Sequence, residues 1–146
     1  MSSAEMPISF ACTQNAVRSV MAKALFEKRL LSADRPAVSC GVIEGPLDGF
    51  VVSVLAEVGV DVSDHEAQVF DALDPGQFAL IISFSREAED KAQRWARPDC
   101  TTLFWDVRPP HVSERSREET LDSYRQIRDE IDGLLTEFFR ENMQKT

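Results

Sequence analysis

Short apolar runs alternate with helix-like segments four times along this chain, and this alternation restricts the fold more than any other feature of the sequence. Each run has the length and composition of a buried strand, and each precedes a stretch with helical spacing of its apolar residues. The predicted strands are 7–12, 37–42, 78–84 and 101–106, and the predicted helices are 19–31, 47–58, a short one over 86–89, and 117–141. Such alternation predicts a parallel sheet between layers of helices. We therefore expect an α/β fold, a three-layer α-β-α sandwich with a four-stranded parallel sheet, formed by residues 1–146 as a single domain.

Composition excludes several classes of protein. With 16 Lys and Arg residues against 25 Asp and Glu, the formal net charge is −9, which disfavours binding to nucleic acid or to an anionic membrane. No apolar run approaches the roughly 18 residues of a membrane span, and the N-terminus lacks the basic and apolar regions of a secretory signal. The cysteines Cys12, Cys40 and Cys100 are odd in number and widely spaced, which fits neither a disulfide framework nor a zinc site. We predict a protein of the reducing cytoplasm with no metal and no cofactor.

The segment between the first predicted strand and the first predicted helix carries the clearest chemistry. Ligands of parallel sheets bind at the carboxyl ends of the strands, which is where Cys12 lies. The N–H groups of a short loop and of a helix N-terminus can surround a tetrahedral anion, and an arginine can bind two of its oxygens. The same positive field would stabilise a thiolate, a nucleophile placed beneath the phosphorus atom. The predicted phosphate-binding residues are Thr13, Gln14, Asn15, Ala16, Val17, Arg18 and Ser19.

A simpler interpretation of this segment stays open at this point. The spacing of Cys12 and Arg18 is common by chance, although a strand before it and a helix after it strengthen the prediction. The alternative is that Cys12 is a buried residue at a strand end, as free cysteines commonly are, and that Arg18 is a surface residue.

The segment from Ile8 to Ala22 resembles the N-terminus of the low-molecular-weight protein tyrosine phosphatase family, whose loop reads Cys-x-Gly-Asn-x-Cys-Arg-Ser. Thioredoxin-coupled arsenate reductases share that fold and loop. Residues 45–65, 78–85 and 105–107 with the acidic final helix are similar to later parts of the family, so the resemblance covers nearly the whole chain. It implies the phosphotyrosine protein phosphatase I-like fold. It also implies phosphomonoester hydrolysis, with a phosphorylated small molecule or phosphoprotein as partner and with phosphate or arsenate as bound oxyanions.

The resemblance also implies roles for individual residues. Cys12 matches the nucleophile, Arg18 the phosphate-binding arginine, and Asn15 and Ser19 the residues that brace the loop and the thiolate. Ser19 would donate a hydrogen bond to the sulfur and ease its departure in the second step.

Two positions of the loop depart from the family pattern. Gln14 stands where the family has a glycine that frees the backbone, so we expect it to reshape the loop or to project an amide toward the mouth. Val17 replaces the second cysteine, which many members use for reversible oxidative protection.

A larger departure concerns the general acid. Pro109 stands where the family has the aspartate that protonates the leaving group. Asp106 is the candidate for a displaced acid and His111 is a second; the alternative for Asp106 is a strand-end residue that holds the loop. The aromatic pair that walls the phosphotyrosine ring in the family is also missing, which puts a preference for phosphotyrosine in doubt.

The competing functions are a weakly active or non-catalytic oxyanion-binding module and an arsenate reductase. The absence of an aspartate at the general-acid position is the reason to consider the oxyanion-binding module. The second is disfavoured, because residues 84–92 contain no cysteine for the disulfide cascade of those enzymes.

Overall fold

A computed structural model describes residues 6–29 and 35–144, with side chains as far as Arg140. Four parallel strands form one sheet in the order β2-β1-β3-β4. The strands are β1 (Ile8–Cys12), β2 (Ala37–Gly41), β3 (Leu80–Ser83) and β4 (Thr101–Phe104). The helices are α1 (Arg18–Arg29), α2 (Gly49–Ala56), α3 (Arg86–Trp95) and α4 (Arg117–Gln144), with two 3₁₀ turns at Phe70–Ala72 and Pro75–Gln77. The predicted α/β class and the four-stranded parallel sheet are confirmed.

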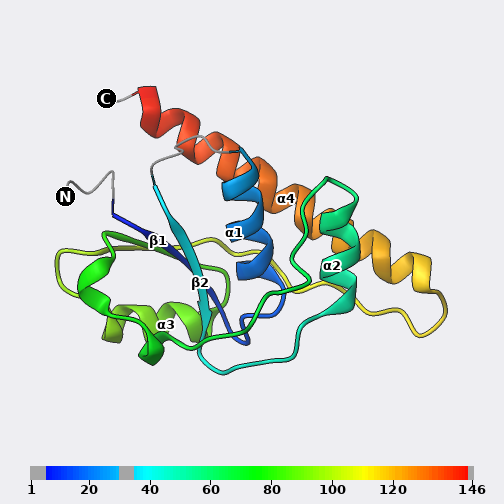
Figure 1. Cartoon of the computed structure of the whole chain (residues 1–146), viewed down its shortest axis with the longest axis horizontal. Coiled ribbons are helices and arrows are strands. Elements are labelled where there is room, and N and C mark those ends of the chain that lie inside the picture. Colours follow the sequence, from blue (N-terminus) through cyan, green and yellow to red (C-terminus); the bar gives the residue numbers. More distant parts are fainter. Residues whose placement is uncertain (1–5, 30–34, 145–146) are drawn as a thin grey trace.

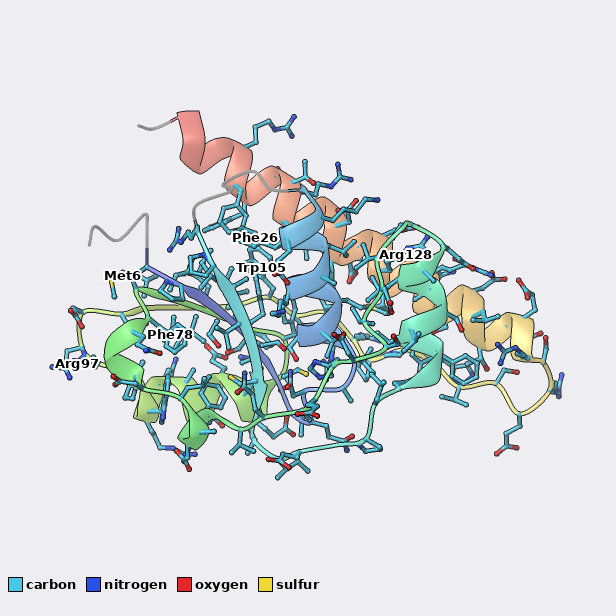
Figure 2. The ribbon with its side chains drawn as sticks, in the orientation of Figure 1. Met6, Phe26, Phe78, Arg97, Trp105 and Arg128 are labelled. Atoms are coloured by element: carbon cyan, nitrogen blue, oxygen red, sulfur yellow. The ribbon has the colours of Figure 1, made fainter. Side chains whose placement is uncertain are left out.

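Helices cover both faces of the sheet, as Figure 1 shows. Helices α1, α2 and α4 pack on one face, and α3 with the two 3₁₀ turns packs on the other. The first apolar layer contains Phe26 and Trp105, and the second contains Phe78, which lies on the opposite side of β1 (Figure 2). The predicted sandwich of three layers is therefore present.

Alternation along β1 decides which face each site residue joins. Ile8, Phe10 and Cys12 are buried in the layer beneath α1, whereas Ala11 joins the opposite layer. This alternation is the two-residue period of a strand. It brings the sulfur of Cys12 to the side of the sheet on which α1 begins.

Helix α3 is longer than the sequence predicted. It begins after Ser85, whose hydroxyl accepts a hydrogen bond from Ala88 N as an N-cap, and continues to Trp95 instead of ending near residue 89. Its apolar positions are small, and the larger Trp95 supplies the burial by packing against Phe70 and Phe78. No helix within the described ranges is long and apolar enough to cross a membrane.

Ser83 gives a first test of the energetics of this fold. It is 1% exposed, and its hydroxyl has no hydrogen-bond partner among the described residues. Because an unpaired buried hydroxyl costs free energy, Ser83→Ala should raise the free energy of unfolding by about 1 kcal/mol. Urea unfolding would measure this. Ser9→Ala is the matched control: Ser9 is equally buried but bonds to Cys40, so its loss should not stabilise the chain. A destabilised Ser83→Ala variant would contradict the argument.

Ion pairs join the end of α2 to α4 and make stability depend on pH. Hydrogen bonds from Arg125, with further help from Arg128, lower the pKa of Glu57 to about 2. A carboxylate with a lowered pKa stabilises the folded chain above its ordinary pKa, and this stabilisation is lost as the pH falls from about 4.5 toward 2. Glu57→Gln should therefore lower stability at pH 7 more than at pH 3, with a modest effect because the pair is solvent-exposed. Urea unfolding at both pH values, with the exposed Glu130→Gln as control, checks this; a pH-independent difference would contradict it.

Candidate oxyanion-binding site

The carbonyl oxygens of the segment that follows β1 accept hydrogen bonds from the segment that follows β2. Thr13 O accepts hydrogen bonds from Val42 N (2.9 Å) and Ile43 N (3.0 Å), and Gln14 O accepts one from Gly45 N (2.9 Å). The backbone N–H groups of residues 13–17, in contrast, have no acceptor in the part of the chain that the structure describes. Buried or partly buried N–H groups are nearly always paired, and a run of free ones forms an anion-binding concavity.

Asn15 has the most constrained backbone of this loop. Its φ of 55° lies in the left-handed region, which asparagine tolerates better than most residues. Three hydrogen bonds hold it there: Nδ2 donates to Ser19 Oγ (2.9 Å), Oδ1 accepts from Gln68 N (3.0 Å), and its carbonyl oxygen lies 2.9 Å from His65 Nε2. The predicted bracing role of Asn15 is consistent with these contacts.

Cys12 and Ser19 are in direct contact. Cys12 Sγ lies 2.9 Å from Ser19 Oγ, and both side chains are buried. Since Asn15 Nδ2 donates to the same oxygen, the hydroxyl hydrogen of Ser19 is free to point at the sulfur. A donor aimed at the sulfur stabilises negative charge there, as a nucleophile and leaving group requires.

Arg18 is anchored by one end of its guanidinium. Nη1 donates to Phe84 O (2.7 Å) and to Val107 O (2.8 Å), which fixes the plane of the group between β3 and the segment after β4. No acceptor among the described residues binds Nε or Nη2. Those nitrogens form the edge of the guanidinium that can bind two oxygens of one anion.

Charges around Arg18 keep it cationic. Partial burial lowers the pKa of Arg18, and the negative charges of Cys12, Glu87 and Asp106 oppose this effect. Glu87 also lies 3.3 Å from Thr13 Oγ1, which is 2.9 Å from Ser85 Oγ. The first turn of α3 is therefore tied to the loop.

The loop opens into a cavity of about 240 Å³. It is lined by Cys12, Thr13, Gln14, Ala16, Val17, Arg18, Pro109 and Pro110. The predicted phosphate-binding residues are thus brought together, with Asn15 and Ser19 behind the lining residues. Asp106 and His111 are not among the lining residues, and both are exposed.

Asp106 lies at the tip of a tight turn in which Val107 N donates to Trp105 O (2.8 Å). This turn buries Val107 and directs its carbonyl to Arg18. The negative charge of Asp106 acts on the site by raising the pKa of Arg18. Its function as an acid stays a prediction.

Gln14 occupies the usual glycine position without a left-handed backbone, since Asn15 is the one non-glycine residue of positive φ in the described chain. Its side chain lies over Gly45, where an added Cβ would come within 2.8 Å of Gln14 Cβ and 2.7 Å of Oε1. Gly45 therefore supplies the space that Gln14 needs. Gln14 lines the cavity, and whether it reshapes the loop or projects its amide toward the mouth stays a prediction.

Sequence reasoning missed several contributors to the site. His65 and Gln68, which hold Asn15, come from the connection after α2, and Glu87 comes from α3. Gly41 is another, because a Cβ there would lie 2.7 Å from Asn15 N. The one sequence signal for His65 is the resemblance of residues 45–65 to the family, which gives this histidine no role.

The side chains of the other two cysteines do not face Cys12. Cys40 joins the apolar layer on the opposite face of the sheet, where burial raises the pKa of its thiol to about 12. Cys100 directly precedes β4 and so lies at the opposite edge of the sheet, roughly 15 Å away along the strand direction. Neither can form a disulfide with Cys12 in this fold, because bridged Cα atoms lie within about 7 Å and their side chains converge.

Comparison with known proteins agrees with this geometry. A family model described as low molecular weight phosphotyrosine protein phosphatase matches residues 7–146. The arsenate reductase of Bacillus subtilis (strain 168) is 28% identical over 131 residues, which is 90% of this chain and 93% of the relative.

Solved structures share the fold. The low molecular weight protein tyrosine phosphatase from T. tengcongensis superposes with a TM-score of 0.78 at 24% identity, covering 93% of this chain and 99% of that one. An arsenate reductase in the phosphate binding state has a TM-score of 0.72 at 18% identity, covering 93% and 98%. At these identities the likeness establishes the fold. The family resemblance predicted from the sequence is confirmed. The arsenate reductases are more similar to this chain than the absence of cysteines in residues 84–92 led us to expect.

Proposed function

Because the chain belongs to the low molecular weight phosphotyrosine protein phosphatase family, we propose that it hydrolyses phosphomonoesters through a thiophosphate intermediate on Cys12. The substrate is a phosphorylated small molecule or phosphoprotein of the reducing cytoplasm, in keeping with the three free cysteines. The observation that carries this proposal is the run of unpaired backbone N–H groups over residues 13–17. Together with the free edge of Arg18, they suit the three non-bridging oxygens of a phosphoryl group.

In the first step the Cys12 thiolate attacks phosphorus, the S–P bond forms, and the P–O bond to the leaving group breaks. Arg18 and the loop N–H groups stabilise the charge on the equatorial oxygens in the transition state. In the second step water attacks phosphorus and the S–P bond breaks. The sulfur keeps the electron pair, stabilised by the Ser19 hydroxyl at 2.9 Å.

Arsenate reduction is the second candidate, since curated relatives carry that name. It would use the same loop, with arsenate in place of phosphate. Reduction of As(V) to As(III) takes two electrons, supplied by Cys12 and a second thiol that form a disulfide as arsenite leaves. Because the side chain of Cys40 lies on the opposite face of the sheet and Cys100 lies at the opposite end of the strands, an external thiol would have to be that second partner.

Two assays on the native protein separate the candidates. The first follows p-nitrophenyl phosphate hydrolysis with a chelator present, and rapid-quench peptide mass spectrometry looks for a phosphoryl group on Cys12. The second follows arsenite formation from arsenate with glutathione or with thioredoxin and its reductase. We expect hydrolysis with a phosphorylated Cys12 and arsenite formation no faster than the thiol background.

Thiol-dependent arsenite formation without hydrolysis would replace the phosphatase by the reductase. If neither reaction occurs and calorimetry still shows phosphate binding, the chain is an oxyanion-binding module instead.

A further inference from the structure

We infer that the substrate of this site is an acyl phosphate, a mixed anhydride of a carboxylic acid and phosphoric acid, whose leaving group departs without a proton from the protein. This inference rests on the proposed phosphatase function and specifies its substrate class. Two features of the cavity support it: the side chains at its outer wall and the presence of Gln14 in its lining.

The outer wall of the cavity holds no proton donor. Beyond Cys12 and the loop, its lining consists of Pro109 and Pro110, and no carboxylic acid or histidine of the described chain lines it. Asp106 and His111 are exposed and outside the lining; Asp106 acts on Arg18 through its charge, and the backbone of His111 donates from N to Ser123 Oγ (2.6 Å). Proline carries no backbone N–H either, so this wall offers a leaving group no hydrogen at all.

The acidity of the leaving group then decides which substrates react. A phenol has a pKa of about 10, and a phenolate that leaves unprotonated at neutral pH is a poor leaving group. A carboxylic acid has a pKa of about 4, so a carboxylate leaves in its stable ionised form. A site without an acid therefore selects for the second class, by the roughly 10²–10⁴-fold that general acid catalysis contributes.

Gln14 supplies what a carboxylate leaving group needs instead of a proton. Gln14 lines the cavity and is exposed, and its side-chain amide has no hydrogen-bond partner in the described part of the chain. Cβ and Oε1 of Gln14 lie nearest to Gly45, and the terminal torsion of a glutamine is broad, so its NH₂ group can turn to a substrate in the cavity. An acyl phosphate carries a carbonyl next to its bridging oxygen, and an N–H donor can bind that oxygen as negative charge spreads onto it.

The reaction balances without another reagent. The Cys12 thiolate forms the S–P bond, the bridging P–O bond breaks, and its electron pair leaves with the carboxylate. Water then attacks phosphorus and forms a new O–P bond. The S–P bond breaks, its electron pair stays on sulfur, and one proton of the water passes to a phosphoryl oxygen. Pro109 and Gln14, two of the three departures from the family pattern, both line the cavity.

The test compares acetyl phosphate with phenyl phosphate. For the native protein we expect kcat/KM to be at least about 10³-fold higher for acetyl phosphate. Pro109→Asp, which restores a carboxylic acid at an exposed position, should raise the ratio of phenyl to acetyl phosphate turnover by about 10²-fold. Pro109→Asn is its matched control, with similar shape and no acid, and should leave that ratio near the native value.

Gln14 is tested by Gln14→Glu, which removes the donor and adds a like charge. We expect kcat/KM for acetyl phosphate to fall by about 10-fold or more. Gln77→Glu makes the same change at an exposed position in the second 3₁₀ turn and should have no effect.

Two results would overturn the inference while leaving the phosphatase intact. One is Cys12-dependent hydrolysis of phenyl phosphate within about 10-fold of acetyl phosphate, abolished in Asp106→Asn, which would make Asp106 the acid. The other is a Gln14→Glu variant as active as the Gln77→Glu control. Absence of Cys12-dependent turnover with every substrate would instead remove the proposed function, and the inference with it.

Discussion

Cys12→Ser should lower kcat/KM for p-nitrophenyl phosphate by at least about 10⁴-fold, because serine at this site is a far weaker nucleophile than a thiolate. The substitution preserves the size of the side chain and its contact with Ser19 Oγ. Phosphate binding should therefore survive, because the backbone N–H groups of residues 13–17 and the guanidinium of Arg18 are untouched. The measurement is steady-state hydrolysis together with calorimetric titration of phosphate.

Cys100→Ser is the control for this change. Cys100 is partly exposed and lies at the opposite edge of the sheet, so its replacement should leave the rate within about 2-fold of native. Residual activity of Cys12→Ser above one tenth of native, in a variant that unfolds at the native temperature, would rule out the thiolate mechanism.

Arg18→Lys should lower kcat/KM by about 10³-fold despite retaining the positive charge. A lysine cannot donate to Phe84 O and Val107 O while presenting two further N–H groups to one anion. The lost interactions are those that stabilise charge in the transition state, so the decrease should fall mainly on kcat. Stability should also decline, because one carbonyl of the pair loses its donor.

The matched control is Arg97→Lys. Arg97 is exposed and lies at the far end of the molecule from α2, beside the second 3₁₀ turn (Figure 2). Its kinetic constants should equal those of the native protein. A comparably small loss in both variants would show that Arg18 acts as a simple point charge.

The sequence predicted the sheet and the loop because both depend on local patterns. The run Phe78–Phe84 is apolar enough to identify a strand covered on both faces, and β3 lies within it. The loop of residues 12–19 is contiguous, so its strand-loop-helix context was readable directly.

The parts of the site that were not predicted depend on contacts between distant segments. His65 lies 50 positions from the carbonyl that it bonds, and nothing in its neighbouring residues signals that partner. The space that Gly45 leaves for Gln14 is likewise visible only when both segments are folded. The length of α3 was underestimated because its buried positions are alanines, which give a weak apolar pattern.

The hydrogen bonds that shape the loop come from segments spread over most of the chain, including Val42, His65, Phe84 and Val107. The loop therefore has this conformation only when the whole chain is folded, and an oxyanion bound there as proposed would bind the folded form alone. Binding of such a ligand would be thermodynamically linked to folding: at a concentration of 100 times its Kd it would add about 2.7 kcal/mol to the free energy of unfolding. Under the proposed function, the concentration of phosphate would therefore set part of the stability of the folded chain.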